Sequence, residues 1–203
     1  MHSDEFDNRH FPVTMLEFDE RQLKINLASV PKLARVAFAA ACAERLAPAY
    51  KRFAEISGRG APELLSSILA RLWADLQGVP MAVAESNANI RHCLALVPTE
   101  EDGSWIDEQA AAEDHVSALL YALTCLQGGE PQEAAWSARN VFEALNSFVE
   151  YRDGRGETQQ AELVRQKRDL DELMACKEAD LSELTARLRE RAQKESSAVF
   201  GTS

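Results

Sequence analysis

The chain has 203 residues, of which 46% are hydrophobic and 27% charged, and its formal net charge is −11. This composition is typical of a soluble globular protein that can bury a core, whereas the acidic balance argues against a nucleic-acid binder, which presents a basic face. The longest apolar run, Val36–Ala43, is far shorter than the roughly 20 residues of a membrane span. The N-terminus, Met1–Glu5, lacks the basic-then-apolar pattern of a signal peptide. We therefore expect a cytoplasmic protein with neither nucleic acid nor membrane as a partner.

The four cysteines lie singly along the chain, so no C-x-x-C pair indicates a zinc ribbon or a redox pair. Cys42 and Cys125 fall in Ala- and Leu-rich helical patterns, where a free cysteine behaves as a small buried hydrophobe. We expect structural thiols.

The first segment, 1–26, is expected to be an N-terminal extension, irregular in part. Val13–Leu27 is the one stretch with an extended pattern, although short helices fit it as well. Residues 27–200 are expected to form one all-helical domain, because period-2 strand patterns are nearly absent elsewhere.

A helical pattern from Pro31 to Ile56 opens this domain. Pro48 is expected to kink or split the helix, because proline lacks a backbone donor and clashes with the preceding turn. The next helix is predicted to start at Pro62, a favoured first-turn residue, and to close at Gly78.

Three further helices are predicted before residue 153. The first spans Ala82–Leu96. The second is capped by Ser104 or Asp107 and ends at the pair Gly128–Gly129. The third starts near Pro131 and ends at Asp153–Gly154.

The last predicted helix runs from Gln160 to about Lys194, and its apolar residues follow a 3–4 grid. It is expected to lie along the bundle, or alternatively to offer a heptad seam for a homodimer. These patterns predict an all-α, single-domain bundle of six or more helices with a long C-terminal helix.

The stretch Phe38–Phe53 resembles the F-x-x-x-x-x-E-R-x-x-P-x-Y-x-x-F signature of the YjaG-like family, small all-helical bacterial proteins of unknown function. The resemblance covers residues 27–200 and is specific only over this stretch. It implies a fold and brings no catalytic residues. Glu44 and Arg45 with Tyr50 either form a functional cluster or pair with neighbouring helices around the Pro48 kink, and we expect the pairing.

No motif indicates an enzyme, and we expect neither catalytic residues nor a cofactor. A nucleophile elbow and a glycine-rich phosphate loop are both missing from the sequence. His92 and His115 lack metal-ligand spacing, so no metal site is expected. His115 is interpreted as a polar residue near a helix start, and a helical metalloenzyme around the two histidines is the weakest alternative.

Charge is distributed unevenly along the chain. Between Thr99 and His115 there are seven acidic residues and no Lys or Arg. Trp105 lies within this stretch, where it is either an interface anchor or buried under the loop. The stretch is either a solubilising surface or a docking surface for a basic protein. The predicted partner-binding residues are Glu100, Glu101, Asp102, Trp105, Asp107, Glu108, Glu113 and Asp114.

These observations favour a protein that binds and neutralises another protein. The specific hypothesis is an immunity protein of an effector–immunity pair, which occludes the active site or blocks the assembly of a cognate secreted antibacterial toxin. That toxin is expected to be basic, with a nuclease and a type VI secretion effector as the candidates. The alternative is a non-enzymatic regulatory adaptor that self-associates through the 160–194 helix.

Overall fold

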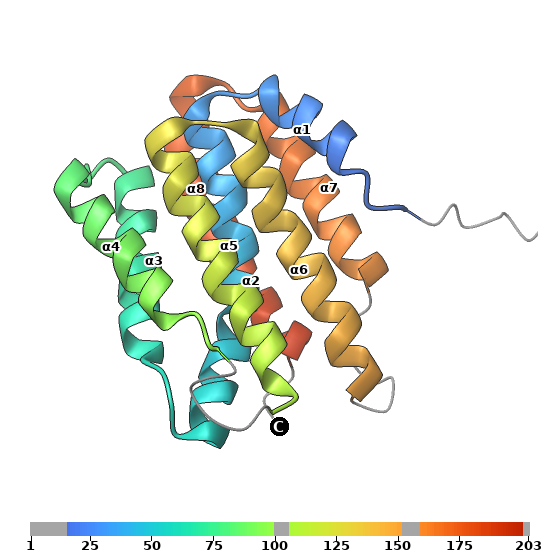
Figure 1. Cartoon of the computed structure of the whole chain (residues 1–203). Coiled ribbons are helices and arrows are strands. Elements are labelled where there is room, and N and C mark those ends of the chain that lie inside the picture. Colours follow the sequence, from blue (N-terminus) through green and yellow to red (C-terminus); the bar gives the residue numbers. More distant parts are fainter. Residues whose placement is uncertain (1–15, 100–105, 152–158, 201–203) are drawn as a thin grey trace, which may run out of the picture.

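The computed structural model describes residues 16–99, 106–151 and 159–200. These described residues contain eight α-helices, one short 3₁₀ helix and no strand, so the predicted all-α, single-domain fold is confirmed (Figure 1). The helices are α1 (Glu20–Ala28), α2 (Lys32–Ser57), α3 (Pro62–Leu76), α4 (Val83–Leu96), α5 (Glu108–Gly128), α6 (Pro131–Tyr151), α7 (Gln159–Ala175) and α8 (Leu181–Phe200), with the 3₁₀ helix η2 (Glu178–Asp180) between the last two.

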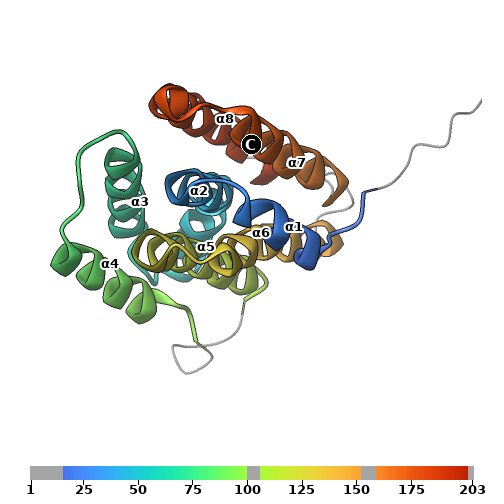
Figure 2. The ribbon, with the colours of Figure 1, turned by 90° about the horizontal axis from the view of Figure 1, so that it is seen from above.

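Helix α2 is the central element of the fold. Seen from above, it is surrounded by α3, α5, α6 and the α7–α8 pair (Figure 2). Its eight consecutive residues Val36–Ala43 are fully buried, which is the pattern of a helix enclosed on all sides. Five of the eight are alanines, namely Ala37, Ala39–Ala41 and Ala43, and these small side chains let the backbones of neighbouring helices approach closely.

Pro48 lies inside α2 and does not split it, because the helix continues to Ser57. Proline removes the donor that would bond the carbonyl four residues earlier and crowds the preceding turn. In that turn, the carbonyl of Ala43 contacts His115 Nδ1 of α5 at 3.1 Å. The carbonyl that loses its donor to Pro48 is that of Glu44, so His115 bonds the carbonyl of the preceding residue and does not replace the missing donor.

The predicted starts and ends of the middle helices are confirmed within a few residues. Pro62 is the first residue of α3, and α2 and α5 both end at a left-handed glycine. Gly60 has a φ of +89°, and a Cβ there would lie 2.6 Å from Tyr50 Oη. Only glycine fits where this loop crosses the tyrosine.

The single helix predicted for 160–194 is wrong. The chain leaves α7 at Ala175, passes through η2 and returns as α8, antiparallel to α7 (Figure 1). One continuous helix over these 35 positions would be about 50 Å long, longer than the 26-residue α2 that it covers. Folding back lets both halves lie on the bundle. Asp180 and Glu183, three positions later, form a capping-box pattern, which signals the start of α8.

The N-terminal extension is not irregular throughout. Helix α1 occupies 20–28 and packs on α6. Before it, Phe18 stacks on Phe142 with ring centroids 5.1 Å apart, and the backbone of Leu16 bonds to the Gln160 side chain. The part from residue 16 therefore belongs to the bundle surface.

Candidate functional site

The predicted acidic site lies partly outside the described residues. Glu100, Glu101, Asp102 and Trp105 fall there, as does Ser104, one of the two predicted caps. The described part starts before α5 and contains the remaining four predicted residues, Asp107, Glu108, Glu113 and Asp114.

Asp107 occupies the N-cap position of α5, but its side chain makes no capping bond. Its φ of −60° and ψ of −30° are helical, whereas a capping side chain needs an extended backbone. The predicted capping role is therefore wrong, and the carboxylate stays exposed to solvent.

The acids at the start of α5 differ in their partners. Glu108 forms an ion pair with Arg52 of α2 at 3.0 Å, and Glu113 accepts a hydrogen bond from Gln109 at 3.1 Å. Within the described residues, no Lys or Arg forms an ion pair with Asp107, Glu113 or Asp114. Three acids of the site therefore have no cationic partner in the described part of the chain.

The environment of Asp114 disfavours the ionised form of its carboxyl group. Burial, followed by the like charges of Glu143 on α6 and of Glu113, raises the pKa of its carboxyl to about 7. Asp114 therefore lies near two like charges, of which Glu143 is itself paired with Arg139 at 2.7 Å, and its carboxyl is partly protonated near neutral pH.

A second polar cluster lies deep between α2, α7 and α8. The guanidinium of Arg45 is only 1% exposed and contacts Glu162 at 3.0 Å and Asp169 at 2.9 Å. Its neighbour Glu44 accepts a hydrogen bond from the indole of Trp73 at 2.7 Å. The expectation that Glu44 and Arg45 pair with neighbouring helices is confirmed. Tyr50 donates to the carbonyl of Leu96 at 3.2 Å.

The two buried carboxylates respond differently to this environment. Burial raises the pKa of Glu162 despite the adjacent Arg45. Burial also opposes ionisation of Asp169, but Arg45 together with Arg168 and Arg191 holds its pKa below the ordinary value. Because its charged groups are mutually paired, this cluster fastens the α7–α8 hairpin to α2.

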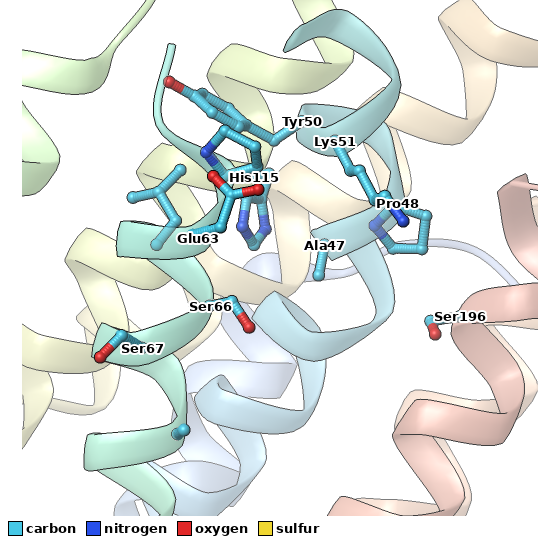
Figure 3. A pocket seen from close by; sticks show the side chains of 12 residues that line it. Ala47, Pro48, Tyr50, Lys51, Glu63, Ser66, Ser67, His115 and Ser196 are labelled. Atoms are coloured by element: carbon cyan, nitrogen blue, oxygen red, sulfur yellow. The ribbon is translucent and has the colours of Figure 1, made fainter. Parts of the chain in front are cut away.

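A cavity of about 650 Å³ opens beside the Pro48 turn. Figure 3 shows α2 and α3 on its two sides, with the His115 imidazole between them in this view and Ser196 of α8 opposite. Its lining residues are Ala47, Pro48, Tyr50, Lys51, Pro62, Glu63, Leu65, Ser66, Ser67, Ala70, His115 and Ser196.

The interpretation of His115 as a polar residue near a helix start is wrong. It lies two turns into α5 and is 2% exposed. Burial lowers the pKa of the imidazole to about 4, and the bond to the Ala43 carbonyl opposes this only in part. The sequence signal that was missed is its position among small apolar residues on the inner face of an amphipathic helix.

Two other expectations concern the thiols and membranes. Cys42, Cys93 and Cys125 are buried, and burial raises the pKa of Cys93 to about 12 and of Cys125 to about 11, as expected for structural thiols. Among the described helices, none is long and apolar enough to cross a membrane. In the same part of the chain, no group of three or more His, Cys, Asp or Glu side chains could hold a metal ion.

Comparison with known proteins places the chain in a family. The model of a family described as a protein of unknown function, DUF416, matches residues 22–200. The chain belongs to the DUF416 family. It is also similar in structure to a DUF416 family protein from Shewanella baltica OS155, with a TM-score of 0.66 and 19% sequence identity. The match covers 84% of this chain and 92% of that one, and at this identity it shows the fold alone. Curated proteins provide no match.

Proposed function

We propose that this protein acts by binding a basic protein partner through the acidic stretch 99–115. The observation that carries the proposal is that Asp107, Glu113 and Asp114, at the start of α5, form no ion pair with any Lys or Arg among the described residues. Exposed acids without an ion pair to a described Lys or Arg also occur elsewhere, as at Glu63, but at the start of α5 three acids without such a pair lie within eight positions of the sequence. By contrast, Glu183 is paired with Arg187 at 2.6 Å and Glu190 with Lys194 at 2.7 Å on α8.

An acidic surface favours binding of a cationic partner in two ways. Long-range attraction steers it toward the acidic face and raises the association rate. At contact, a Lys or Arg near Asp114 offsets the repulsion from Glu113 and Glu143 and favours the ionised carboxylate. Trp105, within the same stretch, is the proposed apolar anchor.

The specific form of the proposal is an immunity protein that neutralises a cognate secreted antibacterial toxin, with a type VI nuclease effector as the candidate. Toxins that act on nucleic acids need a cationic cleft for the phosphates, and an acidic surface can occlude that cleft. The role requires neither catalysis nor a cofactor, and we place it in the cytoplasm. A closer grouping with the YjaG-like proteins also remains a proposal.

Growth rescue tests the proposal. The product of the neighbouring reading frame is expressed with and without this protein, and growth and co-purification are measured. Rescue is expected with the natural chain and is expected to fail when Glu100, Glu101 and Asp102 are changed to lysine.

The matched control reverses three acids elsewhere, Asp171, Glu183 and Glu190, which are 58%, 78% and 68% exposed. This variant changes the net charge equally and should still rescue growth. Equal loss of rescue in both variants would contradict docking through the acidic stretch, and the absence of any toxic neighbour would contradict the immunity role.

The alternative function, a self-associating adaptor, is constrained by how α7 and α8 pack. Five of the six grid residues are buried within one chain, namely Leu163, Leu170, Leu181, Leu184 and Leu188. The apolar side chains left on the surface of α7 are Val164 and Met174, 57% and 49% exposed. Self-association through this region would therefore have to use these two residues instead of the leucine seam.

A further inference from the structure

The cavity beside Pro48 has an apolar floor and a polar mouth. Of its lining residues, Leu65 of α3 is buried and Ala47 and Pro48 of α2 are half-buried, whereas Lys51, Glu63, Ser66 and Ser67 are exposed. Its volume of about 650 Å³ falls within the range of roughly 300–1,000 Å³ that is usual for small-molecule sites.

His115 contributes one directed polar atom to this cavity. Its Nδ1 lies 3.1 Å from the carbonyl of Ala43. Because a carbonyl oxygen can only accept a hydrogen bond, Nδ1 carries the hydrogen and Nε2 carries a lone pair. Within the described residues, no group donates a hydrogen bond to Nε2. A ring that is 98% buried therefore presents an unpaired acceptor to the cavity that it lines.

We propose that this cavity binds a small uncharged molecule with an apolar or aromatic body and a hydroxyl or amide N–H that donates to His115 Nε2. The apolar floor of the cavity contacts the apolar or aromatic body of the ligand. An anion would meet the lone pair of a neutral imidazole, and a cation would meet no buried carboxylate among the lining residues. The cavity shares only His115 with the acidic stretch 99–115, whereas the docking proposal rests on Asp107, Glu113 and Asp114, so the two proposals can fail independently.

The test compares two probes, phenol and anisole. They share an aromatic ring and an oxygen, but only phenol can donate a hydrogen bond. Binding is followed by NMR on the full chain, from the ¹⁵N resonance of Nε2 and the amide resonances around Ala47 and Leu65. Phenol should move the Nε2 resonance to lower frequency, and anisole should bind roughly ten-fold more weakly.

Two variants and one control locate the binding. Ser66→Phe, at an exposed rim position, should block the cavity and abolish the phenol shifts. His115→Phe should remove the preference for phenol. His92→Phe, at an exposed position on α4, should leave binding unchanged.

Three outcomes would overturn the proposal: no saturable phenol binding, equal affinity for phenol and anisole, or unchanged binding by Ser66→Phe. If His115→Phe fails to fold, the probe comparison and Ser66→Phe still decide the matter, because neither depends on replacing the buried imidazole.

Discussion

Arg45 is the residue on which the packing of the C-terminal hairpin depends. Removing an arginine from water is costly, and only close ion pairs with satisfied hydrogen bonds compensate for it. Here Glu162 and Asp169 provide that compensation from α7, and Glu195 of α8 lies 3.5 Å from the same guanidinium. One side chain of α2 thus contacts acids on both arms of the hairpin and fixes where they sit.

Replacing Arg45 should be severe, because it leaves the buried carboxylate of Glu162 without its closest cation and removes one of the three arginines that pair with Asp169. We expect Arg45→Met to lower the free energy of unfolding by about 3–5 kcal/mol, measured by urea denaturation. Arg187→Met is the control, because Arg187 forms an exposed pair with Glu183 and should lose only about 0.3–0.5 kcal/mol. Equal effects of the two substitutions would show that the buried cluster does not fasten the hairpin.

Asp114 gives a pH dependence of stability. Its pKa rises from 3.8 to about 7 on folding, so the unfolded chain releases this proton at lower pH than the folded chain does. The ionised carboxylate therefore destabilises the fold increasingly as the pH rises from about 4 to about 7, and the penalty is constant above that window. Below pH 4 both states are protonated and the penalty disappears.

Asp114→Asn should consequently be more stable than the natural chain at pH 8, by about 1 kcal/mol or more, with the difference shrinking toward pH 4. Urea denaturation at a series of pH values measures this difference. Glu183→Gln, at an exposed position, serves as the control and should show no such trend. A stability difference that does not vary with pH would contradict the raised pKa assigned to Asp114.

Most helices could be predicted from the proline and glycine residues at their ends. The break between α7 and α8 was not predicted, and this has a physical cause. Pro62, Pro131, Gly58 and Gly129 mark helix boundaries through backbone restrictions that act locally. The break between α7 and α8 contains neither proline nor glycine. It arises because both arms must lie on α2, and periodicity within one segment does not reveal that requirement.

A proline substitution at the break distinguishes two short helices from one continuous helix. Glu178→Pro places proline at the first position of η2, after the non-helical Lys177, so it should change stability by less than about 1 kcal/mol. In a continuous helix the same change would cost about 3 kcal/mol. Glu190→Pro, inside α8, is the positive control and should cost that amount in thermal or urea denaturation.

The candidate site could be predicted only in part. The acidic stretch is evident from charge alone, but the sequence does not reveal that Glu108 is neutralised by Arg52. Nor does it reveal that Glu143, 29 positions further along the chain, adds to the negative charge around Asp114. Pairings of this kind depend on which helices become neighbours, as does the burial of His115 beside the Pro48 turn.

The whole molecule is organised around α2, and this limits how the chain could self-associate. Leu184 is 3% exposed and belongs to the core between α8 and its neighbours. Leu184→Ala should therefore lower the free energy of unfolding by about 2–5 kcal/mol without changing the molar mass measured by light scattering. A dimer that dissociates in this variant while the monomer stays folded would favour the adaptor function instead.

A truncation before α7 would test self-association poorly, because it would also expose the face of α2 that α8 covers. Met174→Ser is more informative. Met174 is exposed on α7, so this change should leave the fold intact and should weaken a dimer only if α7 provides its contact surface.

The decisive measurement is the affinity for the protein that co-purifies with the chain, determined by calorimetry for two charge-reversed variants. Asp107→Lys with Glu113→Lys removes unpaired acids from the proposed docking surface, whereas Glu183→Lys with Glu190→Lys makes the same charge change on α8. We predict at least roughly ten-fold weaker binding for the first variant and little change for the second. Equal affinities for the two variants would contradict binding through the start of α5.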